Sequence, residues 1–245
     1  MAFALGNTVI TSAYQVANNM PNIIFDLVAG GLLGAAFIPI FMLEKERHGK
    51  KGGNDFSCNI LNIVIIFMAI LSLLMTVFAP EVIATQTFTV GQTAKVSETA
   101  VLFFRIFAIQ ILFYGIGGVI NAILNGERIY FLPALAPAIN NVVVILAFIA
   151  YAILAPTNEF LAIIILGAGT TLGVAVQAAV QIPALVRIGF KWKPIFNLKD
   201  PALIDAIKIA IPTFIFVLGM LISFTCRNAF SLDVGENGPA TILYA

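Results

Sequence analysis

Long stretches without a charged residue are the feature that most constrains this chain. Five such stretches are 25, 21, 30, 27 and 18 residues long, at 56–80, 106–126, 129–158, 160–186 and 209–226. A helix needs about 20 apolar residues to cross the roughly 30 Å of hydrocarbon in a bilayer. The stretches also lack the alternating pattern of membrane barrel strands. They therefore predict an all-α integral membrane protein, a polytopic helical bundle.

Composition argues against several other classes of protein. The chain is 60% hydrophobic and 10% charged, whereas soluble domains are about 25% charged. A net charge of +1 gives no basic field for nucleic acid. The sequence shows no Ser-His-Asp set, carboxylate pair, phosphate loop or cluster of metal ligands. We therefore expect no catalytic residues, no metal and no cofactor.

The uncharged stretches divide the chain into expected membrane spans. Pro21 interrupts the N-terminal stretch, and a proline bends a helix because it lacks an N–H and clashes with the preceding turn. We expect the tail of a truncated first span at 1–6, a kinked second span at 8–43, further spans at 56–80, 99–126, 129–155, 160–186 and 202–231, and the start of a truncated eighth span at 240–245.

Basic residues distinguish the two sets of connecting loops. The alternate loops at 81–98, 155–159 and 231–239 contain only Lys95, whereas the other set contains ten basic residues. The positive-inside rule places the basic set in the cytoplasm. The ten residues are Lys45, Arg47, Lys50, Lys51, Arg128, Arg187, Lys191, Lys193, Lys199 and Lys208.

Polar residues inside the expected spans are the candidates for function. A charge in hydrocarbon is costly, so such residues usually face a cavity or each other, and an arginine can bind phosphate through two parallel hydrogen bonds. The alternatives are snorkelling of the arginines to the outer headgroups and ordinary interhelical hydrogen bonds from the amides. The candidates for a substrate cavity are Asn18, Asn22, Asp26, Arg105, Gln110, Asn140, Asn141 and Arg227.

Four segments carry a distinctive order of asparagine, proline and glycine. They are MPNIIFDLVAGGLLGAAFIPIF at 20–41, FRIFAIQILFYGIGGVINAILNGERIYFLPALAPAINNVVVI at 104–145, GVAVQAAVQIPALVRIGF at 173–190 and PALIDAIKIAIPTFI at 201–215. In this order they resemble the MurJ/MviN family of lipid II flippases across essentially the whole chain.

The resemblance implies a bundle that belongs to a larger protein. Members of the family have about 14 helices in two bundles, so the chain is expected to be an N-terminal fragment. The implied activity, which is not enzymatic, is movement of lipid II across the bacterial cytoplasmic membrane by alternating access. The implied partners are this anionic lipid-linked substrate, membrane lipids and a coupled monovalent ion, with no nucleic acid.

The sequence departs from the family pattern where substrate arginines would be expected. Family members often carry one or two arginines after the PN motif, and here those positions hold Phe25 and Asp26. Arg105 and Arg227 match basic positions in relatives, but the substrate-binding arginines cannot be carried over residue by residue.

Two other functions stay open at this point. The chain fits an exporter of another lipid-linked polysaccharide or of a drug. It also fits a truncated, non-transporting membrane remnant, because one bundle alone has no second bundle to move against.

Overall fold

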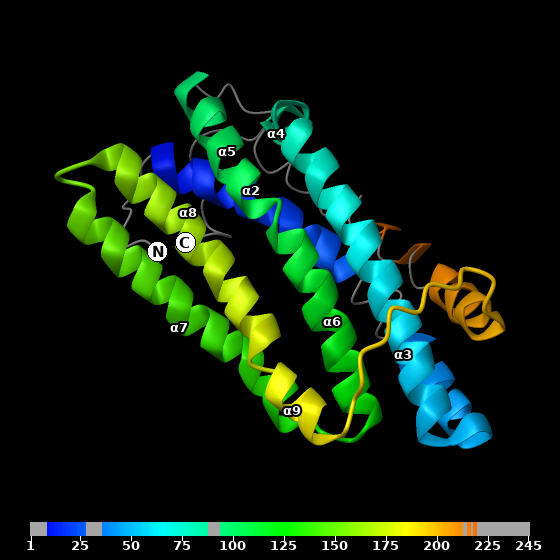
Figure 1. Cartoon of the computed structure of the whole chain (residues 1–245). Helices are drawn as coiled ribbons and strands as arrows, with labels where there is room; N and C mark the ends of the chain where they lie inside the picture. The colour runs from blue at the N-terminus through cyan, green and yellow to red at the C-terminus, as the bar shows by residue number, and fades with distance from the viewer. Residues whose placement is uncertain (1–8, 28–35, 88–93, 213–214, 217, 220–245) are drawn as a thin grey trace.

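The described part of the chain is a bundle of helices without a strand. The structure, a computed structural model, describes residues 9–27, 36–87, 94–212, 215–216 and 218–219. Figure 1 shows long helices running side by side, and a short helical stretch that begins at 201 and is described to 212. The named helices are α2 (Val9–Leu27), α3 (Ile38–Val77), α4 (Ala79–Thr87), α5 (Ala94–Phe107), α6 (Gln110–Gly126), α7 (Phe131–Leu154), α8 (Glu159–Ala179) and α9 (Ile182–Arg187).

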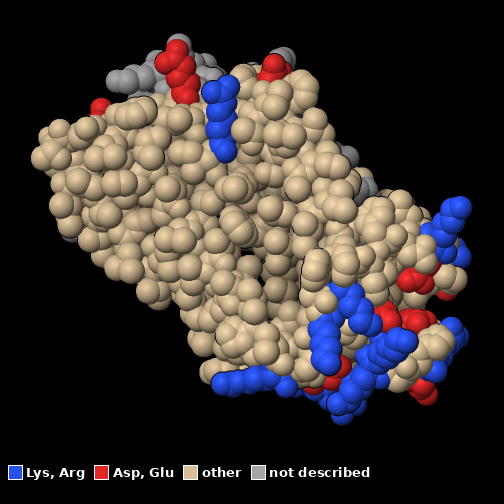
Figure 2. All heavy atoms as spheres, in the orientation of Figure 1, with Lys and Arg blue, Asp and Glu red and all other residues tan. Residues whose placement is uncertain are grey.

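Apolar side chains cover the outside of this bundle. Four helical segments within the described residues are long and apolar enough to cross a bilayer: Ile38–Val77, Glu98–Gly126, Phe131–Leu154 and Glu159–Arg187. Figure 2 shows charged side chains gathered at the two ends of the visible face, with an uncharged band between them. Such a band is the surface that lipid solvates. The prediction of an all-α integral membrane protein is confirmed.

The charged connection at 44–55, expected as a loop, is helical on both sides of one residue. Helix α3 has non-helical backbone angles at Gly49, with φ 66° and ψ −164°. Glycine adopts a positive φ without the steric cost of a Cβ atom. Gly49 therefore joins two helical arms. The limits of the spans stay predictions, because the helices themselves do not mark where a bilayer begins.

The expected span 99–126 is broken into α5 and α6 at residues 108–109. The carbonyl of Ile106 accepts a hydrogen bond at 3.1 Å from the Thr171 hydroxyl of α8. A side chain that enters the backbone ladder is one of the recognised causes of a helix kink. The sequence around this break contains no proline, so a kink could not be predicted there from a proline.

Helices α7 and α8 pack closely through small residues. A Cβ atom added at Gly169 would lie 2.5 Å from Ala147 Cβ, and one at Gly173 would lie 2.3 Å from Asn140 Oδ1. Lipid provides no hydrophobic drive for helix association. Close van der Waals contact over small residues therefore supplies much of the attraction between the helices. The glycines therefore fix the approach of these two helices, which run side by side in Figure 1.

Aromatic rings fill the core between α2 and α5. The Tyr14 ring meets Phe103 and Phe107 edge to face, with centroids 5.5 and 5.4 Å apart. Edge-to-face pairs add about 0.5–1.5 kcal/mol beyond the burial of their area. This cluster holds α2 against the part of the bundle where the polar contacts described below are found.

Candidate functional site

Hydrogen bonds between side chains join α2, α6 and α8 in the interior of the bundle. The Tyr114 hydroxyl donates to Asn22 Oδ1 at 2.9 Å, which links α6 to α2. The Gln110 amide donates to Thr171 Oγ1 at 3.1 Å, which links α6 to α8. The hydroxyls of Tyr14 and Thr170 lie 3.1 Å apart and link α2 to α8. We call these residues the polar seam: Tyr14, Asn22, Gln110, Tyr114, Thr170 and Thr171.

The seam contains a buried acceptor with no partner among the described residues. Gln110 is 0% exposed, and its Oε1 accepts no hydrogen bond there. A buried unpaired polar atom costs about 1–3 kcal/mol. The position therefore suits a water molecule or a polar group of a ligand that can donate to this oxygen.

A small cavity opens between α6, α7 and α8 beside the seam. It has a volume of about 30 Å³ and is lined in part by Tyr114, Asn121, Gln177 and Gln181. Gln181 is 2% exposed, and its Oε1 has no partner among the described residues. This volume is above the roughly 10–15 Å³ that a water molecule needs, so the cavity accommodates solvent and not a substrate.

The structure brings three of the predicted site residues together. The Asn22 amide donates to the carbonyl oxygen of Asn18 at 2.8 Å while its own oxygen accepts from Tyr114. Gln110 precedes Tyr114 by four residues on α6, so the two lie on one face of that helix. Asn18, Asn22 and Gln110 therefore share one region.

The other predicted site residues lie apart from that region or outside the described side chains. Asn140 Oδ1 is buried against Gly173 and has no partner among the described residues. Asn141 on α7 and Arg105 on α5 are exposed, and no described hydrogen bond joins either to the seam. The side chain of Asp26 and all of Arg227 lie outside the part that the structure describes.

Three asparagines that the sequence did not single out hold the segment after α9. Asn54 of α3 accepts from the Lys191 backbone N–H at 2.9 Å and donates to the Lys191 carbonyl at 2.8 Å. Asn59 forms the same pair of bonds with the backbone of Asn197, at 2.8 and 3.0 Å. Asn62 donates to two carbonyls of the segment, both at 2.8 Å, and accepts from the Trp192 indole.

The spacing of these asparagines was a usable signal. Asn54 and Asn62 lie eight residues apart, on one face of a helix with Cys58 between them, and Asn59 lies beside that face. Asn59 and Asn62 stand among apolar residues at the start of the 56–80 stretch, and Asn54 lies just before it. Each can satisfy an N–H and a carbonyl of an extended strand of chain. Such a row predicts a docked segment, although not which segment docks.

The described helices and contacts define a multi-pass helical membrane protein. Long apolar helices are joined by interior polar contacts, and basic side chains gather at one end. The sequence matches, over residues 1–245, the profile of the family described as "Lipid II flippase MurJ". The chain belongs to this family and is a multi-pass protein of the bacterial cytoplasmic membrane. The resemblance noted from the sequence is confirmed.

Several curated relatives align with the whole of this chain. The chain is 27% identical over 256 residues to a probable lipid II flippase MurJ of Rhizobium meliloti, covering all of this chain and 46% of the relative. It is 24% identical over 249 residues to the lipid II flippase MurJ of Burkholderia cenocepacia, covering all of this chain and 48% of the relative. The chain therefore spans about half the length of the curated relatives it matches.

A solved structure shares the fold. It is described as "Lipid II flippase MurJ, inward closed conformation", with a TM-score of 0.66 and 20% sequence identity. The match covers 87% of this chain and 42% of the solved chain. It indicates that the helices are arranged here as in one part of that protein.

Proposed function

We propose that this chain forms the N-terminal bundle of a lipid II flippase. The flippase moves the undecaprenyl-pyrophosphate-linked precursor across the cytoplasmic membrane by alternating access, and it acts as a transporter, not as an enzyme. The observation that carries the proposal is the match of all 245 residues to the family profile. The alignment of the full chain with curated flippases supports it.

The polar seam supplies the wall of the transport pathway in this proposal. Its amides and hydroxyls join α2, α6 and α8 within the apolar bundle, and the unpaired Gln110 Oε1 offers an acceptor there. Polar groups at membrane depth usually mark a substrate or ion pathway. We therefore assign Asn18, Asn22 and Gln110 to this wall.

The remaining candidates keep the roles that the sequence suggested. Arg105 and Arg227 supply positive charge for the pyrophosphate, because a guanidinium matches phosphate oxygens with two hydrogen bonds. Asp26, Asn140 and Asn141 complete the polar set. A monovalent ion or the membrane potential drives the cycle.

A chimera tests the proposal. Residues 1–245 replace the matching half of the Burkholderia cenocepacia relative, in cells depleted of their own flippase, and outer-leaflet lipid II is measured with an externally added probe. We expect the chimera to restore lipid II exposure, and a Gln110→Leu chimera to insert normally but to restore much less. Asn158→Ala, which removes an exposed helix cap of α8, is the matched control and should transport normally.

The same assay separates the proposal from its competitors. An exporter of another lipid-linked polysaccharide would insert normally and leave lipid II exposure at the depleted level. A non-transporting remnant would give the same result and would also move no other lipid-linked sugar. Either outcome, with normal insertion of the chimera, contradicts the proposed function.

A further inference from the structure

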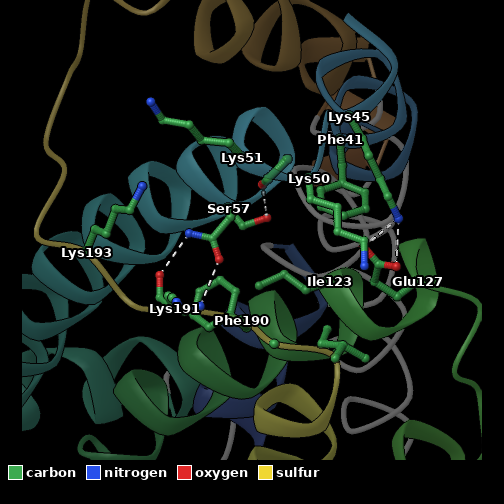
Figure 3. Close-up of a pocket in the computed structure, with 14 residues that line it drawn as sticks. Phe41, Lys45, Lys50, Lys51, Ser57, Ile123, Glu127, Phe190, Lys191 and Lys193 are labelled. Atoms are coloured by element: carbon green, nitrogen blue, oxygen red, sulfur yellow. Dashed lines mark hydrogen bonds and ion pairs between the residues drawn. The ribbon is translucent and has the colours of Figure 1, made fainter. Parts of the chain in front are cut away.

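A hollow with a volume of about 260 Å³ lies at the basic end of the bundle, away from the polar seam. Figure 3 shows that it is formed by the start of α3, the end of α6 and the segment that follows α9. Five lysines surround it, and we call it the lysine hollow after them: Lys45, Lys50, Lys51, Lys191 and Lys193.

The lysine hollow contains more positive charge than its carboxylates neutralise. Lys45 donates to both oxygens of Glu127 at 2.7 Å, and Lys193 pairs with Asp55. Lys50, Lys51 and Lys191 form no ion pair with any described residue. Figure 3 shows Lys51 and Lys193 on one side of the hollow, with Lys45 and Glu127 on the other.

The hollow is held in shape by contacts that do not use the free ammonium groups. The Asn54 side chain donates to the Lys191 carbonyl and accepts from the Lys191 N–H. Beneath the rim, Phe41 is 2% exposed, and Gly126 leaves it room, since a Cβ atom there would lie 2.7 Å from the Phe41 ring. A ligand can therefore bind without first ordering the backbone around it, which lowers the entropic cost of binding.

Apolar residues form the floor of the hollow, and a neighbouring tryptophan indicates how deep in the membrane the hollow lies. Phe41, Ile123, Ile188 and Phe190 line it together with the lysines, and Phe41 and Ile123 are buried. Next to it, Trp192 is 61% exposed, and its indole N–H is bound to Asn62. Tryptophans of this kind sit at the level of the lipid headgroups. The hollow therefore joins an apolar floor to a cationic rim at the boundary of water and lipid.

We propose that the lysine hollow binds the phosphate group of an anionic membrane lipid in the cytosolic leaflet. Basic pockets between membrane helices on the cytosolic side bind such headgroups. The volume of 260 Å³ falls just below the roughly 300–1,000 Å³ of sites for drug-sized molecules. The hollow therefore fits a headgroup and not a whole lipid-linked saccharide. The apolar floor favours a lipid over free phosphate.

The test measures lipid binding and needs no transport. The intact protein is placed in phosphatidylcholine nanodiscs with increasing phosphatidylglycerol, and retained phosphatidylglycerol is counted by native mass spectrometry. In the Lys50→Gln, Lys51→Gln, Lys191→Gln variant, phosphatidylglycerol binding should weaken about tenfold or more, because each lysine near an anionic lipid contributes separately. Replacement of the same three lysines by arginine should retain it.

A matched control removes the same charge from the same end of the molecule. Arg47, Lys199 and Lys208 are exposed and do not line the hollow, so their replacement by glutamine should leave binding within about twofold of the parent, since separated surface charges are largely screened by salt. Equal loss of phosphatidylglycerol binding in both variants would attribute the effect to general surface charge and would overturn the proposal. Unchanged binding in the Lys50→Gln, Lys51→Gln, Lys191→Gln variant would also overturn it.

Two further measurements close the remaining gaps. If the triple variant does not fold, single Lys51→Gln and Lys191→Gln variants carry the test, each with a loss of about threefold. In detergent, inorganic phosphate and glycerol phosphate should compete with phosphatidylglycerol only weakly. Competition by free phosphate as strong as that of the lipid would overturn the assignment to a lipid. Failure of the flippase proposal would leave these binding results unchanged.

Discussion

At the scale of single residues, the hydrogen bond from Tyr114 to Asn22 offers a measurable contact inside the bundle. Its donor and acceptor are 2.9 Å apart and join α6 to α2. Interhelical hydrogen bonds in membranes average about 0.6 kcal/mol. We expect Tyr114→Phe to lower the free energy of unfolding in bicelles by about this amount, and a double-mutant cycle with Asn22→Ala to give a coupling of similar size.

Tyr130 provides the control for this prediction. It is exposed, at 59% of its surface, so Tyr130→Phe should leave the unfolding free energy unchanged. Zero coupling between Tyr114 and Asn22 would show that the bond contributes nothing, and their place in the polar seam would then need another explanation.

Gly173 gives a second prediction at the residue scale. An alanine Cβ there would lie 2.3 Å from Asn140 Oδ1 and 3.3 Å from the Asn140 carbonyl oxygen. Overpacking of this kind costs about 1–3 kcal/mol, so Gly173→Ala should destabilise the protein by that amount. Gly219→Ala, where no described residue lies within 4 Å of the added Cβ atom, is the control.

The partner residue makes the Gly173 prediction specific. Asn140→Ala removes the side chain nearest the new methyl group, so it should restore part of the stability lost in Gly173→Ala. If the two changes add without rescue in chemical unfolding, the contact between α7 and α8 is not the cause of the loss.

At the scale of elements, the docked segment after α9 depends on α3. Asn59 and Asn62 each form several hydrogen bonds to it, and a bond of this type contributes about 0.5–1.5 kcal/mol. In Asn59→Ala, Asn62→Ala, endoproteinase Lys-C should cleave after Lys193 and Lys199 about tenfold faster or more, since cleavage follows the population of the open form. Asn158→Ala, at the other end of α8, should not change the rate. Unchanged cleavage in the double variant would mean that other contacts hold the segment.

The elements also show how far a sequence of this kind can be interpreted. A bilayer selects apolar residues along the whole length of a span and basic residues in its cytosolic loops. The helical membrane class could therefore be predicted from the sequence alone. The break at 108–109 depends on Thr171 reaching Ile106 from a helix distant in the chain, and Gly49 turns the chain inside a charged helix. The contact from Thr171 leaves no signal in the sequence around the break. Gly49 can be seen in the sequence, but a glycine alone does not show that the chain turns there. Asn18, Asn22 and Gln110 were candidates because amides are uncommon among apolar residues, and their role stays a prediction. Asn59 also stands among apolar residues, but the sequence does not identify the remote segment that it binds.

At the scale of the whole molecule, the separation of charge predicts which end faces the cytosol. Lys50 lines the lysine hollow at the basic end, and Glu159 begins α8 at the other end. Translocating clustered lysines against the membrane potential is unfavourable, so the basic end stays inside. In a variant with Cys58 and Cys226 replaced by serine, a membrane-impermeant maleimide should label Glu159→Cys on intact spheroplasts. It should label Lys50→Cys only after the membrane is permeabilised. Labelling of Lys50→Cys from outside would show that the bundle has the opposite orientation. The lysine hollow would then face the outer leaflet, where no lipid of the cytosolic leaflet could occupy it.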